Sequence, residues 1–202
     1  SMENTLTAWI SIGSTYTYLT ALRLRSVADK YNIRLNFRPF SVRQIMQSMN
    51  NIPFPPEKQT KVAYMWRDIE RRAKGYGLPA PAVPAPYPLK DFDLINKLGI
   101  VANEDNFYLS FLEQTYSAWF VHGLPAGSTD HIDQLAENLS FDKDALLARA
   151  QSDHVEAVYR ENTVQAQNLG VFGAPSFMVG SEIFWGDDRL EDAISFLKGE
   201  LS

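Results

Sequence analysis

The chain has 202 residues, enough for one domain or for one domain that carries a sizeable insertion. Its 45% hydrophobic and 21% charged residues are ordinary for a globular protein, and its net charge of −5 excludes a basic surface for nucleic acid or an anionic membrane. No apolar run approaches the roughly 18 residues of a membrane-spanning helix, and the stretch Ser1 to Asn4 lacks the features of a signal peptide. We therefore expect a cytoplasmic protein with no nucleic-acid or membrane partner.

The chain contains no cysteine, which excludes disulfides, a thiolate nucleophile and cysteine-rich metal sites. Its three histidines, His122, His131 and His154, show no metal-ligand spacing. Each lies beside charged or helix-surface residues, so we expect all three at the solvated surface. No metal site is predicted.

The stretch from Ala8 to Leu19 predicts a short buried strand, a tight Gly-Ser turn and the start of a helix that continues to Tyr31. Ser14 falls at the junction, where an N-cap residue belongs. A helix start offers unpaired N–H donors and a partial positive charge, which suit an anion such as a thiolate or carboxylate. The alternative is that Ser14 only caps its own helix.

The next segments favour a parallel strand–helix–strand unit followed by helices. Alternating apolar and polar residues at 33–39 predict a second strand that ends at Pro39. Helices are predicted at 42–49 and 57–76, separated by a Pro-rich turn. Five prolines between Leu78 and Pro88 exclude regular structure and predict a rigid loop, a plausible wall of a pocket.

Residues 90–169 have helical patterns throughout. The expected starts and stops in this block are Asp105, Asp130 and Asp153, and Gly123 and Gly170. Strand patterns return only at 176–179 and 182–185, where the Gly180-Ser181 connection predicts a hairpin, and a last helix is expected from Asp188 to Lys198.

The strands thus lie at the two ends of the chain, with an all-helical block between them. This order is that of an α/β protein with a thioredoxin-like fold and a helical insertion. We assign residues 1–40 and 160–202 to the thioredoxin-like domain and residues 41–159 to the inserted helical domain.

Three motifs resemble those of one group of enzymes. Gly13–Leu19 resembles the S-P-[FY]-S-[YW]-L turn of the 2-hydroxychromene-2-carboxylate isomerases and the kappa-class glutathione transferases, which share a DsbA-like architecture. Gly170–Phe177 resembles their G-[AV]-F-G-x-P segment, and Phe184–Leu190 their F/W-G-x-D-R-[LM] segment. Two weaker landmarks, at 61–65 and 77–79, match in order and spacing. The resemblance therefore spans nearly the whole chain.

This resemblance implies that glutathione is the cofactor and that Pro175 is cis. The backbone of Ala174 would pair with the cysteinyl part of glutathione, and the γ-glutamyl part would lie near four residues: Trp185, Gly186, Asp187 and Asp188. Its ammonium would bind the Asp188 carboxylate, although Asp188 and Glu191 also have the spacing of a capping box, and we expect both roles. Lys61 resembles a lysine that meets a glutathione carboxylate, although a lysine on a helix is commonly just solvated.

Other residues are assigned to the second substrate by the same resemblance. Asn51 and Ile52 correspond to a turn beside the substrate, where Asn50 could equally be the matching amide, and Tyr87 matches a tyrosine that lines the substrate pocket. Trp119, in a helix interior, is expected in the core. The resemblance also implies a homodimer.

The chemistry follows from what a serine can do. No His or Lys is visibly placed to activate Ser14 as a nucleophile, so its hydroxyl is expected to donate to the glutathione sulfur and favour the thiolate. The resemblance then implies cis–trans isomerisation of an unsaturated aromatic 2-oxo acid, a step of naphthalene-type breakdown. Thr15 replaces the usual proline, and its hydroxyl is available to help hold the sulfur, while Gly13 replaces a larger apolar residue and loosens the turn.

Two other functions use the same residues. A kappa-type transferase or peroxidase would consume glutathione and release a conjugate or oxidised glutathione. A non-catalytic DsbA-like domain would bind glutathione or a peptide and turn over no electrophile.

Overall fold

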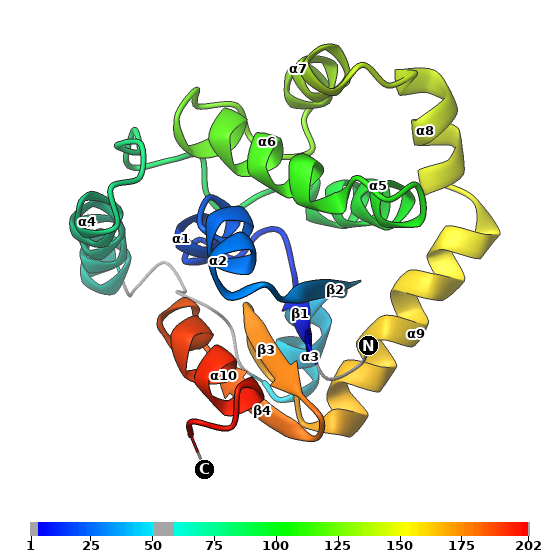
Figure 1. Cartoon of the computed structure of the whole chain (residues 1–202). Helices are drawn as coiled ribbons and strands as arrows, with labels where there is room; N and C mark the ends of the chain where they lie inside the picture. The colour runs from blue at the N-terminus through cyan, green and yellow to red at the C-terminus, as the bar shows by residue number, and fades with distance from the viewer. Residues whose placement is uncertain (1–3, 51–58, 202) are drawn as a thin grey trace.

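The computed structural model describes residues 4–50 and 59–201. Its centre is a four-stranded sheet in the order β2-β1-β3-β4 (Figure 1). Strand β1 is parallel to β2 and antiparallel to β3, and β3 is antiparallel to β4. The strands are β1 (Thr5–Ile10), β2 (Arg34–Pro39), β3 (Ser176–Val179) and β4 (Glu182–Trp185). The predicted strands at both ends of the chain, including the hairpin, are confirmed.

Helices fill most of the remaining described chain. They are α1 (Thr17–Ala21), α2 (Leu24–Tyr31), α3 (Val42–Ser48), α4 (Gln59–Gly75), α5 (Phe92–Glu104), α6 (Tyr108–Phe120), α7 (Thr129–Leu139), α8 (Lys143–Ala150), α9 (Asp153–Leu169) and α10 (Leu190–Leu197), the last preceded by the 3₁₀ turn η3 (Asp187–Arg189).

Two predicted helix boundaries are wrong. The helix expected to reach Tyr31 without interruption is broken at Leu22 and Arg23, between α1 and α2. Asp105 does not start a helix: it is the C-cap of α5, and α6 begins three residues later at Tyr108. Here Asn106 takes a left-handed conformation with a φ of +65°, which reverses the chain between the two helices.

The two faces of the sheet carry separate apolar clusters, because successive side chains of a strand point to opposite faces. Leu6, Ala8 and Ile10 of β1 belong to the large cluster that includes residues of α1, α2, α5, α6 and α10. Trp9 points to the other face, where it meets Phe40 edge-on and packs with residues of α3 and α9. The sheet is therefore covered on both sides.

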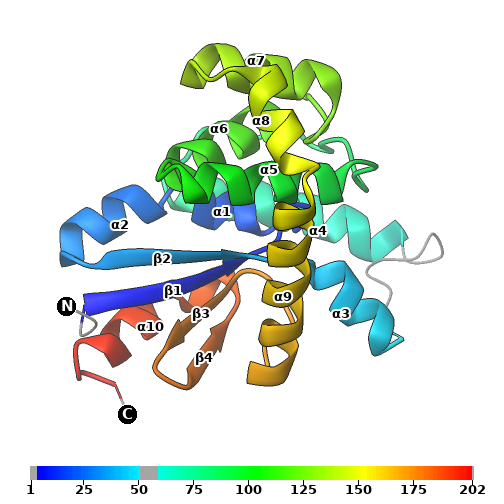
Figure 2. The same ribbon diagram turned by 90° about the vertical axis from the view of Figure 1, so that its right-hand side faces the viewer.

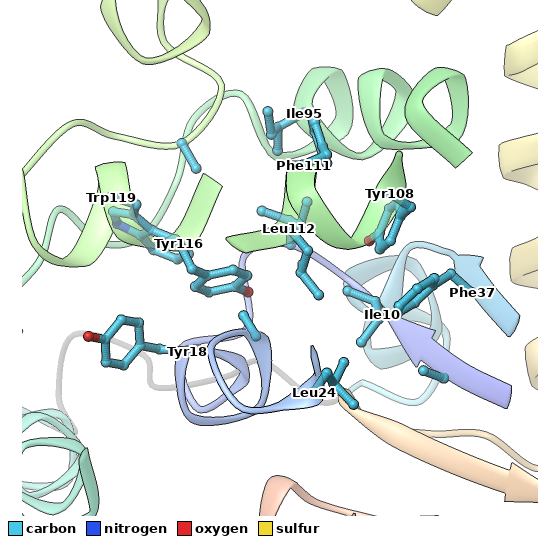
Figure 3. Packing of buried hydrophobic residues seen from close by; sticks show 14 of the residues in the cluster. Ile10, Tyr18, Leu24, Phe37, Ile95, Tyr108, Phe111, Leu112, Tyr116 and Trp119 are labelled. Carbon is cyan, nitrogen blue, oxygen red and sulfur yellow. The ribbon is translucent and has the colours of Figure 1, made fainter. Parts of the chain in front are cut away.

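Figure 2 shows the strands one above another in the order β2, β1, β3 and β4, with α9 in front of them, and with α5, α6, α8 and α7 stacked beyond β2. The close-up in Figure 3 shows Leu112 and Tyr116 of α6 packed between α5 and α1, with Ile10 and Phe37 of the sheet nearby. Helix α9 descends from α8 to the sheet without a break. It passes through the proposed boundary at residues 159 and 160, so one continuous helix joins the two proposed domains.

The expectation that all three histidines are solvated is wrong for His131. Its side chain is 0% exposed, and the two ring nitrogens contact Gly127 and Thr115. The Gly127 N–H donates to Nδ1 at 3.2 Å, so the proton sits on Nε2, which lies 3.0 Å from the Thr115 carbonyl. Burial lowers the pKa of His131 from 6.5 to about 4. The neutral imidazole of His131 thus connects α7 to α6. The other two histidines, His122 and His154, are exposed as expected.

Within residues 4–50 and 59–201, no helix is both long and apolar enough to cross a membrane.

Candidate functional site

The turn that carries Ser14 follows β1 directly and is held by contacts from the helical layer. Gly13 has φ of +125°, a conformation that glycine adopts without steric cost, and its α-carbon faces Phe92. The Ser14 N–H donates to the Ser11 carbonyl at 3.2 Å, and the Ser14 carbonyl accepts a 2.6 Å hydrogen bond from the Tyr116 hydroxyl. Tyr116 reaches this turn from α6, above α1 in Figure 3. Tyr116 of α6 therefore holds the backbone at Ser14 in place.

Ser14 does not cap the helix, contrary to the prediction. Helix α1 begins at Thr17, and its N-cap residue, Tyr16, makes no side-chain capping hydrogen bond. The Ser14 hydroxyl instead donates to the Ala174 carbonyl at 2.8 Å. An N-cap side chain would accept a backbone N–H, but α1 begins three residues beyond Ser14, so Ser14 does not stand at its N-cap position.

The loop before β3 brings the second predicted motif to this turn. The Ala174–Pro175 peptide is cis, as the resemblance implies. The Pro175 carbonyl accepts a 2.9 Å hydrogen bond from the N–H of Gly186, the residue directly after β4. The structure therefore brings Ser14, Ala174 and Gly186 together from the two ends of the chain.

Trp185 forms an exposed aromatic wall beside this loop. Its side chain is 56% exposed, and its ring centroid lies 5.0 Å from that of Phe172. The indole packs directly on Gly173, where an added Cβ would lie only 2.2 Å from the indole Nε1. Glycine at 173 is therefore needed for Trp185 to stand where it does.

The two acids that follow Trp185 have different environments. Asp187 is 4% exposed, and its carboxylate is held by the Arg72 guanidinium through both terminal nitrogens. Burial raises the pKa of Asp187, against the opposing effect of Arg72. The Asp187 carboxylate is thus held in an internal ion pair, and the predicted position of Asp187 near glutathione stays a prediction.

Asp188 is exposed, and its carboxylate lies against the α-carbon of Gly186. The predicted capping role is wrong: the N-cap of α10 is Arg189, with no side-chain capping hydrogen bond, and Glu191 instead pairs with Arg23. The 3₁₀ turn η3 separates Asp188 from the start of α10. Of the two acids, Asp188 is the one whose carboxylate faces solvent beside the Ser14 turn and the cis-proline loop.

Helix α4 packs beside the Ser14 turn through one face. The Thr15 hydroxyl donates to the Met65 sulfur at 3.0 Å, and the Tyr16 hydroxyl donates to Asp68 at 2.8 Å. Lys61 lies one turn before Met65, on the same face, and is exposed. The hydroxyl of Thr15 is buried and donates to Met65, so it would have to leave that partner to help hold another sulfur atom.

Tyr87 is half-buried in the Pro-rich loop and meets Trp66 of α4 edge-on, with ring centroids 5.8 Å apart. Burial raises the pKa of Tyr87, and the charge of Arg43 opposes that rise. The other predicted substrate residues, Asn51 and Ile52, lie outside the described residues. Trp119 is core, as expected, and its indole N–H donates to the Pro86 carbonyl at 2.7 Å.

A separate surface hollow of about 530 Å³ lies between α4 and the Pro-rich loop. Its lining, which includes Arg67, Arg71 and Leu78, contains none of the predicted site residues.

Three residues near the site were missed from the sequence: Arg43, Arg72 and Tyr116. Arg72 lies eleven positions after Lys61 on the same helical face, a signal that the periodicity of α4 contains. Tyr116 and Arg43 carry no comparable signal, because their roles depend on which element packs on which.

Comparison with known proteins agrees with this arrangement. A family model described as a DsbA-like thioredoxin domain matches residues 5–198. A 2-hydroxychromene-2-carboxylate isomerase of Sphingobium xenophagum is 28% identical over 97% of this chain and 99% of its own length. A glutathione S-transferase kappa 2 of Caenorhabditis elegans is 23% identical over 91% of this chain and 87% of its own length.

Among solved structures, a 2-hydroxychromene-2-carboxylate isomerase superposes with a TM-score of 0.85 at 22% identity, covering 96% of this chain and 95% of that one. This similarity is one of fold. Because the superposition covers nearly all of both chains, it includes the helices between β2 and β3. Since the family model spans almost all of the sequence as well, the chain belongs to the DsbA-like thioredoxin domain family.

Proposed function

We propose that this protein is a glutathione-dependent cis–trans isomerase of the 2-hydroxychromene-2-carboxylate isomerase type, acting on an unsaturated aromatic 2-oxo acid. The observation that carries the proposal is the Ser14 hydroxyl, 2.8 Å from the carbonyl of the residue before a cis proline, in a chain without cysteine. Thiol exchange by the protein itself is impossible, so any thiol must arrive with a cofactor. Full-length similarity to a named isomerase supports the same reaction.

The residues around Ser14 offer the groups that glutathione needs. The Ala174 backbone would pair with its cysteinyl part, and the exposed Asp188 carboxylate would accept its ammonium group. Lys61, on the α4 face that contacts the Ser14 turn, would meet a carboxylate. Trp185 and Gly186 would flank the γ-glutamyl part, while Asp187 would keep them in place through Arg72.

Ser14 would act as a hydrogen-bond donor. In the described part of the chain, its hydroxyl touches no His or Lys that could take its proton, so it is a poor nucleophile. Turned from the Ala174 carbonyl toward a sulfur atom, the same O–H would stabilise the charged form and lower the thiol pKa. When bound, glutathione would supply a thiolate that adds transiently to the substrate double bond, allows rotation, and leaves unchanged.

The first test is calorimetric titration of the protein and of Ser14→Ala with reduced glutathione, followed by turnover of 2-hydroxychromene-2-carboxylate. Both proteins should bind one glutathione per chain, and Ser14→Ala should lose more than about half of its turnover, since one donor to the charged sulfur is gone. No saturable binding to the wild type up to millimolar glutathione would refute the cofactor. Normal turnover of Ser14→Ala would refute the role of Ser14.

The second candidate is a kappa-type transferase or peroxidase, which the similarity to the nematode kappa enzyme favours. It would use the same thiolate but consume glutathione. Measuring reduced glutathione before and after many turnovers separates the two: an isomerase leaves its amount constant. We further propose a homodimer, which light scattering of the purified protein would test.

A further inference from the structure

The hollow between α4 and the Pro-rich loop lies on the side of α4 that faces away from the Ser14 turn. Met65 and Asp68 contact that turn. With 3.6 residues per helical turn, Arg67, Arg71 and Lys74 stand nearly opposite them. Figure 1 shows α4 at the left-hand edge of the molecule. The hollow has a volume of about 530 Å³, which is within the range of small-molecule sites. Its lining residues are Arg67, Glu70, Arg71, Lys74, Leu78, Ala80 and Pro81.

The α4 wall of this hollow is positively charged in a chain whose net charge is −5. Three cations, Arg67, Arg71 and Lys74, stand against one acid, Glu70. Arg71 follows Arg67 by four residues and precedes Lys74 by three, so the neighbouring charges on this face repel one another. The helix dipole accounts for Lys74 in the last turn, but Arg67 lies about two turns before the end of α4. Helix stability therefore does not explain the row of cations.

The protein itself leaves most of this charge without a partner. The Arg67 Nη1 lies 3.4 Å from the Glu70 Oε1, which is longer than the usual length of about 2.7–2.9 Å for a charge-assisted hydrogen bond. This pair is largely exposed to solvent, where it contributes little. Within residues 4–50 and 59–201, no Asp or Glu carboxylate lies within ion-pair distance of Arg71 or Lys74. Two of the three cations are therefore available to an external anion.

The wall formed by the Pro-rich loop is apolar and anchored by hydrogen bonds. Leu78 is half-buried and Pro81 is buried. The Leu78 N–H donates to the Ala73 carbonyl at 2.9 Å, and the Pro79 carbonyl accepts a 2.6 Å hydrogen bond from the Tyr18 hydroxyl. Because the loop is tied to both α4 and α1, the hollow is formed before any ligand binds, which lowers the entropic cost of binding.

A row of cations opposite an apolar wall suits an organic anion with more than one charge. From Arg67 to Lys74, α4 rises by about 10 Å, which is more than one carboxylate covers. Guanidinium groups bind phosphate oxygens through two parallel hydrogen bonds, and a lysine binds them as a point charge.

We propose that this hollow binds an organic diphosphate of the nucleoside diphosphate class. Its phosphates would contact Arg67, Arg71 and Lys74, and its ring would pack on Leu78 and Pro81. No lining residue belongs to the Ser14 site, so this inference does not depend on the proposed function.

The test is calorimetric titration with ADP at constant ionic strength and without magnesium, which would compete for the phosphates. Inorganic pyrophosphate and adenosine, titrated in the same way, separate the contribution of the phosphates from that of the ring. The main variant is Arg71→Gln, and Arg71→Lys keeps the charge without the planar fork.

Two further variants serve as controls. Arg160→Gln is the matched one, because Arg160 is exposed on α9, on the other side of the molecule in Figure 1, and forms no ion pair within the described residues. Lys61→Gln removes an exposed cation from α4 on the side of the Ser14 turn, so it reports on binding there.

The wild type should bind one ADP per chain with a Kd below about 1 mM. Pyrophosphate should bind more weakly, and adenosine should show no saturable binding. Arg71→Gln should bind ADP about tenfold more weakly, through loss of a hydrogen bond to a charged group, and Arg71→Lys should lose less. Both controls should stay within about twofold of the wild type, because salt screens distant exposed charges. Since Arg71 is exposed, its variants should unfold at the same urea concentration as the wild type, so that a lost affinity is not a lost fold.

No saturable binding of ADP to the wild type at millimolar concentration would overturn the inference, as would equal affinities of the wild type and Arg71→Gln. A tenfold loss in Arg160→Gln would mean that only net charge matters, and the same loss in Lys61→Gln would place ADP at the Ser14 turn; either result also overturns the proposal. If ADP binds no more tightly than pyrophosphate, the part assigned to Leu78 and Pro81 is refuted.

Discussion

The buried His131 makes the stability of the protein depend on pH in a defined window. Because burial lowers its pKa from 6.5 to about 4, the folded protein keeps His131 neutral where the unfolded chain already binds a proton. The unfolded state binds more protons below pH 6.5, so stability falls with pH from about 6.5 to about 4 and levels off below both pKa values. Between pH 7 and pH 5, these two values correspond to a loss of about 2 kcal/mol from this residue alone.

The perturbation is His131→Gln, measured by urea unfolding at pH 7 and pH 5, with the exposed His154→Gln as control. At pH 7, His131→Gln should cost about 1–3 kcal/mol, since the Gly127 N–H or the Thr115 carbonyl loses its partner. Between pH 7 and pH 5, the free energy of unfolding of His131→Gln should fall by about 2 kcal/mol less than that of the wild type, because glutamine does not titrate.

The slope of the unfolding free energy against urea concentration should be the same for the wild type and the variant. The two free energies of unfolding are then comparable. If His131→Gln loses as much stability between the two pH values as the wild type does, the buried neutral imidazole is not the cause and the reasoning is refuted.

Three further substitutions test the site. Arg72→Met should lower the free energy of unfolding by about 3 kcal/mol, since it leaves Asp187 buried without its partner; urea unfolding measures this, and adding Asp187→Asn should restore part of the loss. Gly173→Ala should displace the indole of Trp185, because the new Cβ would lie 2.2 Å from its Nε1; an unchanged tryptophan fluorescence spectrum and unchanged glutathione affinity would contradict this. Asp188→Asn should weaken glutathione binding about tenfold in calorimetry, through loss of a charge-assisted hydrogen bond, while stability stays within about 0.5 kcal/mol.

The strands and their order along the chain were predictable because they depend on local patterns. Alternation defines β2, and Gly180-Ser181 between two apolar runs defines the hairpin of β3 and β4. The position of the helical block followed from the absence of strand patterns between them. The meeting of Ser14, Ala174 and Gly186 came from family resemblance, because no local pattern links residues so far apart.

The errors share one physical cause, which is that partners distant in the sequence override local preferences. Ser14 is a residue type common at N-caps, yet α1 begins only at Thr17 and the Ser14 hydroxyl donates to the Ala174 carbonyl. His131 stands among polar neighbours on its helix, yet α6 covers it and supplies the Thr115 carbonyl. Asp187 and Asp188 are adjacent and chemically identical, yet Asp187 is buried against Arg72 whereas Asp188 is exposed.

The contacts of helix α4 limit how this protein could be redesigned. It contacts the Ser14 turn through Met65 and Asp68, and the segment after β4 through Arg72. It therefore connects the two ends of the chain, although it lies between β2 and β3 in the sequence. A minimal version made by deleting the insertion would lose these three anchors together, so transplanting the site to another thioredoxin scaffold requires α4 to be moved with it.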